Sequence, residues 1–120
     1  MTTATIRIQR SDDDALKHAA DGFVVAWKSG QAQEHVFSFS SPEQLFTVLS
    51  PKRWKLIETL QKLGPSTYRA LATALSRDVK RVHEDTAVLI EWGLVEINED
   101  GRIHVPYDVI KADFDLRSVA

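Results

Sequence analysis

Apolar residues recur along this chain at two spacings, which predict two kinds of element. Spacings of three and four residues from Val79 to Trp92 predict a helix with one buried face. That face consists of Val79, Val82, Thr86, Leu89 and Trp92. Residues 66–76 predict a shorter helix that Ser66 caps. Residues 76–78 predict a tight turn between the two helices.

Two short β-runs follow the long helix. Gly93 stands where the end of a helix favours a residue that can take a positive φ. Leu94–Ile97 and Arg102–Val105 are joined through Asp100-Gly101, which is a strong hairpin signal. Helix, tight turn, helix and hairpin is the order of a winged helix-turn-helix.

Similar patterns predict further elements on both sides of this region. Alternating residues predict strands at Thr5–Gln9, at His35–Ser40 and over residues 110–117, each with one buried face. A helix is predicted from Ser11 to about Lys28, with three aspartates that suit the positive end of its dipole. We expect the three strands to form a small sheet, which that helix, a second protomer or another protein would cover.

Two more helices are predicted between the second strand and residue 64. Ser41-Pro42-Glu43-Gln44 is a capping box that opens a short helix through Leu49. Ser50-Pro51 repeats this start signal, and a helix is predicted from Lys52 to Leu63. The side chains that should face inward from it are Leu56, Ile57, Leu60 and Leu63.

The predicted fold class is α+β. It is a winged helix-turn-helix with an added N-terminal strand-helix-strand segment and a C-terminal strand. Residues 1–49 would serve dimerisation or partner binding, and residues 50–106 would form the winged helix-turn-helix. Residues 107–120 would pack on the N-terminal segment or on a second protomer. A hydrophobic content of 43% is enough for a core.

The net charge of −2 conceals three blocks of different sign. Residues 1–51 carry 4 basic and 6 acidic groups, residues 52–81 carry 8 and 2, and residues 82–120 carry 3 and 9. The middle block, at +6, covers the region where a helix-turn-helix would meet phosphates. A charge run of this kind can also be an ordinary solvated surface.

Short pieces of the same region resemble the MarR-like winged helix-turn-helix transcriptional regulators. These pieces are Leu71-Ala72, Trp92-Gly93-Leu94-Val95 and Asp100-Gly101-Arg102. The chain looks closest to a little-characterised family of small prokaryotic DNA-binding proteins, whose members have a start like Ser50-Pro51-Lys52-Arg53 before the first helix of this region. The resemblance covers roughly Phe37 to Leu116. It implies that relatives are DNA-binding repressors, some of them antitoxins encoded next to a toxin.

A helix in the major groove reads bases with polar side chains on its first two turns. Lys80 and Arg81 are therefore the best candidates for base or phosphate contacts, and Arg77 in the turn is a phosphate candidate. His83 would donate to a base or phosphate, or is a plain surface histidine. Glu84 would accept from a cytosine amino group or position Arg81. Otherwise Glu84 and Asp85 near the start of this helix oppose phosphate binding.

The preceding helix and the hairpin supply the remaining candidates. Backbone N–H groups and hydroxyls in the first turn of that helix commonly hold a phosphate. The residues there are Ser66, Thr67, Tyr68 and Arg69. Tyr68 could equally pack in the core. Arg102 would enter the minor groove or pair with Glu99. The hairpin turn is acidic, whereas such regulators often have basic wings, and this opposes insertion of Arg102 into the minor groove.

Several classes of function have little support. The chain has no cysteine, its four histidines show no metal-ligand spacing, and its glycines form no phosphate-binding loop. We therefore expect no enzymatic activity, no metal and no cofactor. There is no apolar run near the roughly 20 residues that span a bilayer. The N-terminus does not read as a signal peptide, so the expected compartment is the cytoplasm.

Two functions remain. The first is a sequence-specific, DNA-binding transcriptional regulator, a repressor that binds double-stranded DNA as a homodimer through the helix at about 79–92. The alternative is an antitoxin, or another protein-interaction module, that neutralises a partner protein such as a toxin. The −6 block and the three half-buried strands motivate that alternative. The two are compatible, because an antitoxin can also repress its own operon.

Overall fold

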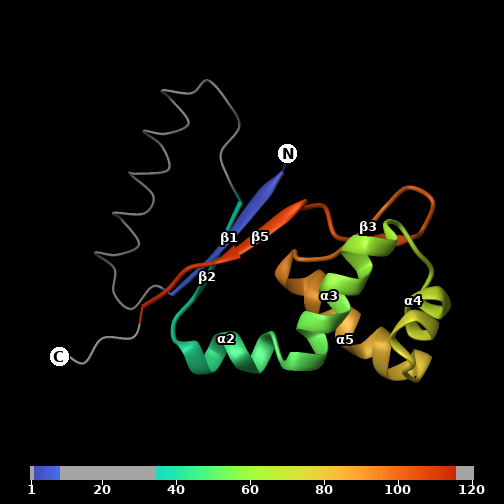
Figure 1. Cartoon of the computed structure of the whole chain (residues 1–120), viewed down its shortest axis with the longest axis horizontal. Helices are drawn as coiled ribbons and strands as arrows, with labels where there is room; N and C mark the ends of the chain where they lie inside the picture. Colours follow the sequence, from blue (N-terminus) through green and yellow to red (C-terminus); the bar gives the residue numbers. More distant parts are fainter. Residues whose placement is uncertain (1, 9–34, 116–120) are drawn as a thin grey trace. The chain divides into compact units, whose positions relative to one another are not determined.

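The computed structural model describes residues 2–8 and 35–115, which form a mixed α+β structure (Figure 1). The chain divides into two compact units, residues 1–45 with 109–120 and residues 46–108. The elements are β1 (Thr3–Ile8), β2 (His35–Phe39), α2 (Pro42–Val48), α3 (Pro51–Leu63), α4 (Tyr68–Leu75), α5 (Val79–Trp92), β3 (Glu96–Ile97), β4 (Ile103–His104) and β5 (Val109–Ala112). The predicted helix from Ser11 to about Lys28 lies outside the described residues.

The first unit contains a three-stranded sheet in the order β2-β1-β5 (Figure 1). Both pairings are parallel, and Ile6 lies opposite Phe37 on β2 and Ala112 on β5. The prediction that these three segments share a sheet is confirmed. Alternation with Ile6 and Ile8 would place Thr5 on the open face of its strand, yet Thr5 is only 4% exposed. It lies on the central strand, and parallel sheets are usually covered on both faces.

The C-terminal strand is shorter than its alternating pattern predicts. Alternation continues from residue 110 to 117, yet β5 ends at Ala112. The N–H of Asp113 still donates to the carbonyl of Ile6 at 3.0 Å. β1 continues to Ile8, two residues beyond its last pair with β5. Alternation by itself therefore does not set the length of β5.

Helix α2 begins with the predicted capping box, except that the Gln44 side chain bonds the residue before Ser41. The N–H of Gln44 donates to Ser41 Oγ at 3.1 Å. In return, Gln44 Oε1 accepts from the N–H of Ser40 at 2.7 Å, and not from that of Ser41. Two backbone donors at the start of the helix are thus satisfied, as a capping box requires. The helix ends at Val48, one residue earlier than predicted.

The second unit packs α3, α4 and α5 around one core, beside the β3-β4 hairpin. The buried apolar residues of these elements and the following segment are Leu56, Ile57, Leu60, Leu71, Ala72, Val82, Leu89, Leu94, Val95, Ile103 and Tyr107. Two predicted core residues are exposed instead, Leu63 at 47% and Val79 at 41%. Each stands at the end of its helix, where the chain turns away and packing against neighbouring helices stops.

The start of α4 differs from the prediction. Ser66 does not cap the helix, because Thr67 Oγ1 accepts from the N–H of Ala70 at 3.1 Å. Ser66 is 7% exposed and donates through its hydroxyl to the carbonyl of Gly64 at 2.8 Å. Its backbone forms a β-bridge with Ile103, with both N–H···O distances at 2.9 Å. This bridge holds Ser66 in the hairpin's hydrogen-bond ladder, so the cap falls one residue later.

The hairpin is also shorter than predicted, with two residues in each strand. Asn98 organises its turn, because Asn98 Oδ1 accepts from the N–H groups of Asp100 and Arg102 at 3.0 and 2.9 Å. Gly101 takes a positive φ of 78°, which glycine adopts at no steric cost. Among the residues that the structure describes, no helix is both long enough and apolar enough to cross a membrane.

Candidate nucleic-acid interface

Helices α4 and α5 are joined by the three-residue turn that the sequence predicts. Ser76 takes a left-handed conformation with φ 54° and ψ 45°, and its N–H donates to the carbonyl of Thr73 at 3.1 Å. The N–H of Arg77 donates to the carbonyl of Ala72 at 3.0 Å. Helix α5 then runs from Val79 to Trp92, and Gly93 ends it with φ 87°. The predicted bounds of α5 and its glycine terminus are confirmed.

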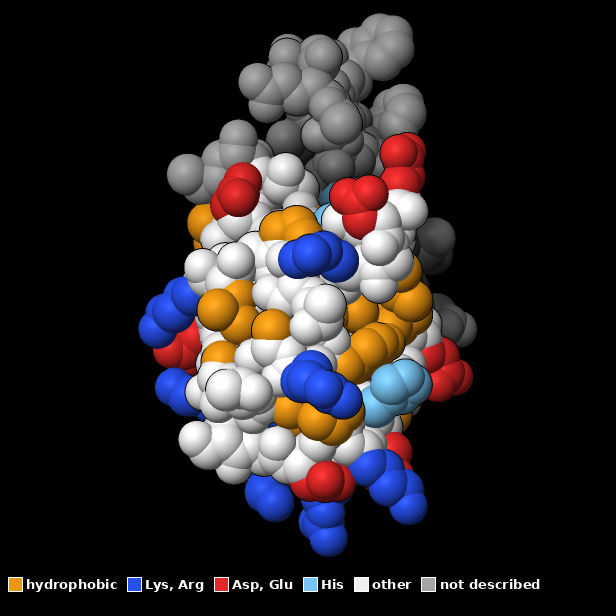
Figure 2. All heavy atoms as spheres, turned by 90° about the vertical axis from the view of Figure 1, so that its right-hand side faces the viewer, with side chains coloured by type: hydrophobic (Ala, Val, Ile, Leu, Met, Phe, Trp, Pro, Cys, Tyr) orange, Lys and Arg blue, Asp and Glu red, His pale blue; other side chains and the backbone are white. Residues whose placement is uncertain are grey.

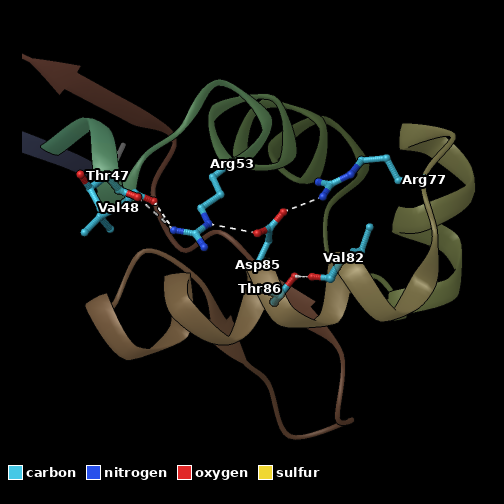
Figure 3. A network of polar contacts seen from close by, with 7 residues as sticks. All are labelled: Thr47, Val48, Arg53, Arg77, Val82, Asp85 and Thr86. Carbon is cyan, nitrogen blue, oxygen red and sulfur yellow. Dashed lines mark hydrogen bonds and ion pairs between the residues drawn. The ribbon is translucent and has the colours of Figure 1, made fainter. Parts of the chain in front are cut away.

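An aspartate between two arginines fixes α5 to the rest of the second unit (Figure 3). Asp85 Oδ1 accepts from Arg53 Nε of α3 at 3.1 Å, and Asp85 Oδ2 accepts from Arg77 Nη2 of the turn at 2.7 Å. Arg53 Nη1 also donates to the carbonyl oxygens of Val48 and Thr47 at 2.9 and 3.3 Å. The cluster Arg53–Asp85–Arg77 therefore links the end of α2, α3, the turn and α5.

The cluster is mostly shielded from water. The side chains of Arg53, Asp85 and Arg77 are 21%, 18% and 19% exposed. Burial alone raises the pKa of the Asp85 carboxyl, but the hydrogen bonds and charges of Arg77 and Arg53 outweigh burial and lower that pKa below its usual value. Asp85 is thus held as a carboxylate whose charge is compensated inside the protein.

This arrangement changes the roles that the sequence suggests for two residues. Arg77 was a phosphate candidate, yet its guanidinium is committed to Asp85, and its buried Nη1 has no hydrogen-bond partner within the described residues. Asp85 was expected to oppose phosphate binding, yet two arginines neutralise it. Arg77 therefore positions α5, and Asp85 adds little negative potential to the outer face of that helix.

Two candidates from different helices come together at the α4–α5 contact. The rings of Tyr68 and His83 stack with centroids 4.2 Å apart and an interplanar angle of 25°. Tyr68 is half-buried and His83 is exposed. Tyr68 is thus neither a full core residue nor a free surface group. The stack covers one face of the His83 ring, although His83 as a whole stays exposed.

The other candidates lie on the surface. Thr67, Arg69, Lys80, Arg81 and Glu84 are exposed, whereas Ser66 is buried. Figure 2 shows Lys and Arg side chains projecting at the lower end of its face, where the turn between α4 and α5 lies in Figure 1. Arg102 is exposed on the hairpin, and within the described chain it forms no ion pair with Glu99, so the suggested pairing of these two residues is wrong.

The +6 block is only partly available to a ligand. Arg53 and Arg77 pair with Asp85, and Lys62 Nζ lies 3.3 Å from Glu58 Oε1 on the surface of α3. The exposed cations of the block that have no ion pair among the described residues are Lys52, Lys55, Arg69, Lys80 and Arg81. In the same part of the chain, no cluster of histidine and acidic side chains could hold a metal ion.

The sequence analysis did not identify the residues whose internal contacts hold this surface in place. Arg53 and Asp85 are 32 positions apart, so no local pattern connects them. Asn98 and Tyr107 were also missed. Tyr107 donates through its hydroxyl to the carbonyl of Gly93 at 3.2 Å, and its carbonyl accepts from Gln61 Nε2 at 3.0 Å. An asparagine three residues before a turn glycine is a recognisable turn signal, whereas no local pattern signals the tyrosine contact.

Comparison with known proteins gives a match to a protein family. A model of the family HVO_A0114 matches residues 48–112, more than half of the 120-residue chain. No curated protein and no solved structure matches the chain. The description of the family names no ligand and no activity, so the resemblance to MarR-like regulators stays a prediction from the sequence. The matched residues span α3, α4, α5, the hairpin and β5, and on this match the chain belongs to the HVO_A0114 family.

Proposed function

We propose that residues 46–108 are a winged helix-turn-helix that binds double-stranded DNA with sequence preference, and that the protein is a transcriptional repressor acting as a homodimer. The observation that carries this proposal is the division of α5 into two faces. Val82, Thr86 and Leu89 are buried, while Lys80, Arg81 and Glu84 on its first two turns are exposed. A helix whose apolar face packs on the core, and whose exposed face carries polar side chains, can enter a major groove.

The internal contacts also suit this role, because they hold α5 rigidly. Thr86 occupies the buried face without an unmet hydrogen-bonding group, since its hydroxyl donates to the carbonyl of Val82 at 2.7 Å. Asp85 ties α5 to α3 and to the preceding turn through Arg53 and Arg77. Base readout depends on side chains that project from a fixed backbone. These ion pairs would fix the register of Lys80 and Glu84 against base edges.

Phosphate contacts would come from both sides of α5. Arg69 is exposed in the first turn of α4, where backbone N–H groups favour anions. Arg102 is exposed after the hairpin turn, where an arginine could reach a neighbouring groove or phosphate. Thr67 is exposed, but its hydroxyl already caps α4. These positions would set the docking orientation, while α5 would supply sequence preference.

The experiment begins with a pool of random duplexes, from which the full-length chain selects its preferred DNA. Affinity for the selected duplex is then measured across salt for wild type, for Lys80→Ala/Arg81→Ala and for Lys52→Ala/Lys55→Ala. The last variant is the matched control, because it removes the same charge from exposed positions on α3. We expect the α5 variant to bind about tenfold more weakly or worse. Its log–log salt slope should be shallower by about 2 per protomer.

Two results would contradict the proposal. One is a selection that enriches no sequence. The other is an α5 variant that binds the selected duplex as well as the α3 control does. A dimer predicts in addition that the selected sequence is palindromic, with half-sites about 10 base pairs apart or a multiple of that spacing. Sedimentation of the complex then gives the number of protomers on each duplex.

A protein partner is the second candidate function, and the sheet favours it. β5 is an outer strand, which pairs with β1 on one side, and Lys111 and Ala112 on it are exposed. An outer strand can accept a strand from another chain. Co-expression with the proteins encoded beside this one, followed by size-exclusion chromatography, tests this function. A complex of defined stoichiometry supports it, and a chain that elutes without any of them refutes it.

A further inference from the structure

Val79 stands at the front of α5 and is exposed, although its spacing assigns it to the apolar face. It is the first residue of the helix and 41% of its surface is open, whereas Val82 three residues later is fully buried. Val79 and His83 are four residues apart and therefore lie side by side on the helix. An apolar side chain is thus exposed next to the Tyr68–His83 stack and directly before Lys80 and Arg81.

We propose that Val79 is a specificity-determining residue that contacts the 5-methyl group of a thymine in the major groove. This inference rests on the proposed function, because it assumes that α5 enters that groove. A valine side chain offers no donor or acceptor, so it cannot pair with the polar edge of a base. The thymine methyl is the apolar group that the major groove presents. Placing valine against a polar base edge would instead desolvate that edge without compensation.

The position of Val79 supports this assignment over a contact with phosphate or sugar. The first turn of a recognition helix is the part that reaches base edges. Lys80 and Arg81 directly follow Val79 and carry charges that suit the DNA backbone. The preference would therefore be for a T·A pair, in one orientation, at one position in each half-site. The polar neighbours would discriminate the adjacent base pairs.

The test uses the full-length chain and the duplex selected above, with each thymine replaced in turn by deoxyuridine, which lacks only the methyl group. For wild type we expect one replacement in each half-site to weaken binding about fourfold, the factor for one buried methyl-sized group. Val79→Ala should bind the unmodified duplex more weakly and should lose its response to that replacement. Leu63→Ala is the matched control, because Leu63 is an apolar side chain that is 47% exposed at the end of α3, away from the proposed DNA contacts.

Each outcome decides a different point. A wild-type protein that binds the selected duplex but responds to no deoxyuridine overturns the Val79 contact and leaves the proposed function standing. An equal response in wild type and Val79→Ala also overturns it, because another residue then contacts the methyl group. A selection that enriches no sequence overturns the proposed function and this inference together. The deoxyuridine series on wild type needs no variant, so the absence of any response overturns the Val79 contact even if Val79→Ala does not fold.

Discussion

Replacing Asp85 by asparagine should destabilise the protein strongly, although it changes few atoms. The asparagine side chain keeps its size but loses the charge that holds Arg53 and Arg77, whose nitrogens lie 3.1 and 2.7 Å from the carboxylate. A hydrogen bond to a charged group contributes about 1.5–3 kcal/mol, and breaking a fully buried ion pair costs about 3–5 kcal/mol. The three side chains keep about a fifth of their exposure, which lets water compensate in part. We therefore expect a loss of about 2–3 kcal/mol in the free energy of unfolding.

The dependence of this loss on pH identifies its cause. The pKa of Asp85 is lowered in the folded state from its usual value of 3.8. The stabilisation is therefore fully present above about pH 4, and it is lost as the pH falls through the folded-state pKa. Urea unfolding followed by circular dichroism should show a constant difference in the free energy of unfolding between wild type and Asp85→Asn near neutral pH. That difference should shrink below about pH 4, because Asp85 of the wild type becomes protonated.

Glu84→Gln is the matched control, because Glu84 is the exposed acidic neighbour on the same helix. It should change the free energy of unfolding by less than about 0.5 kcal/mol. The reasoning would be refuted if Asp85→Asn cost no more than this control at pH 7. It would also be refuted by a gap between wild type and Asp85→Asn that stayed constant down to pH 2.5, since such a gap could not come from the Asp85 charge.

Three further predictions follow from local geometry, each measured by urea unfolding. Thr67→Ala should cost about 1 kcal/mol, because it removes the cap of α4; no loss would mean that another group caps the helix. Ser76→Gly should stabilise by about 0.5–1 kcal/mol, because φ is 54° at this position; a net loss would show that contacts of the serine side chain outweigh its backbone strain. Burial, and then the charge of Glu96, raise the pKa of Tyr107 above its usual 10.0. The contribution of Tyr107 to the free energy of unfolding should therefore be fully present below about pH 10 and should fall as the pH rises through the folded-state pKa. Tyr107→Phe should not show this loss of stability at alkaline pH.

Helix α5 shows how much of the candidate site local sequence can predict. Its bounds follow from the turn before Val79 and from Gly93 after Trp92, and both signals act within a few residues. The same pattern mispredicts Val79, because periodicity says which residues share a face and not where the neighbouring elements end. Whether a terminal residue is covered depends on the length of the helices packed against it, which is a property of the assembled unit.

Arg77 and Ser66 show the same limit for single side chains. Both have chemistry that suits a phosphate, and both stand at positions where a helix-turn-helix would meet one. In the folded protein, Arg77 pairs with Asp85, and Ser66 pairs with Ile103 through its backbone. The partner of Ser66 lies 37 positions away, and Arg77 stands in the turn before α5, outside the helix that carries Asp85, so the repeat of one element relates neither pair.

By itself, the sequence of this protein determined the order of its elements in the second unit, the turn at Ser76 and the glycine terminus of α5. These features depend on backbone preferences and on hydrogen bonds between near neighbours, which a short stretch of chain carries with it. Tertiary structure alone decided the parallel order β2-β1-β5, the bridge between Ser66 and the hairpin, and the Arg53–Asp85–Arg77 cluster. It also decided which cations of the +6 block remain exposed and unpaired among the described residues, because an ion pair between distant positions forms only when the chain folds.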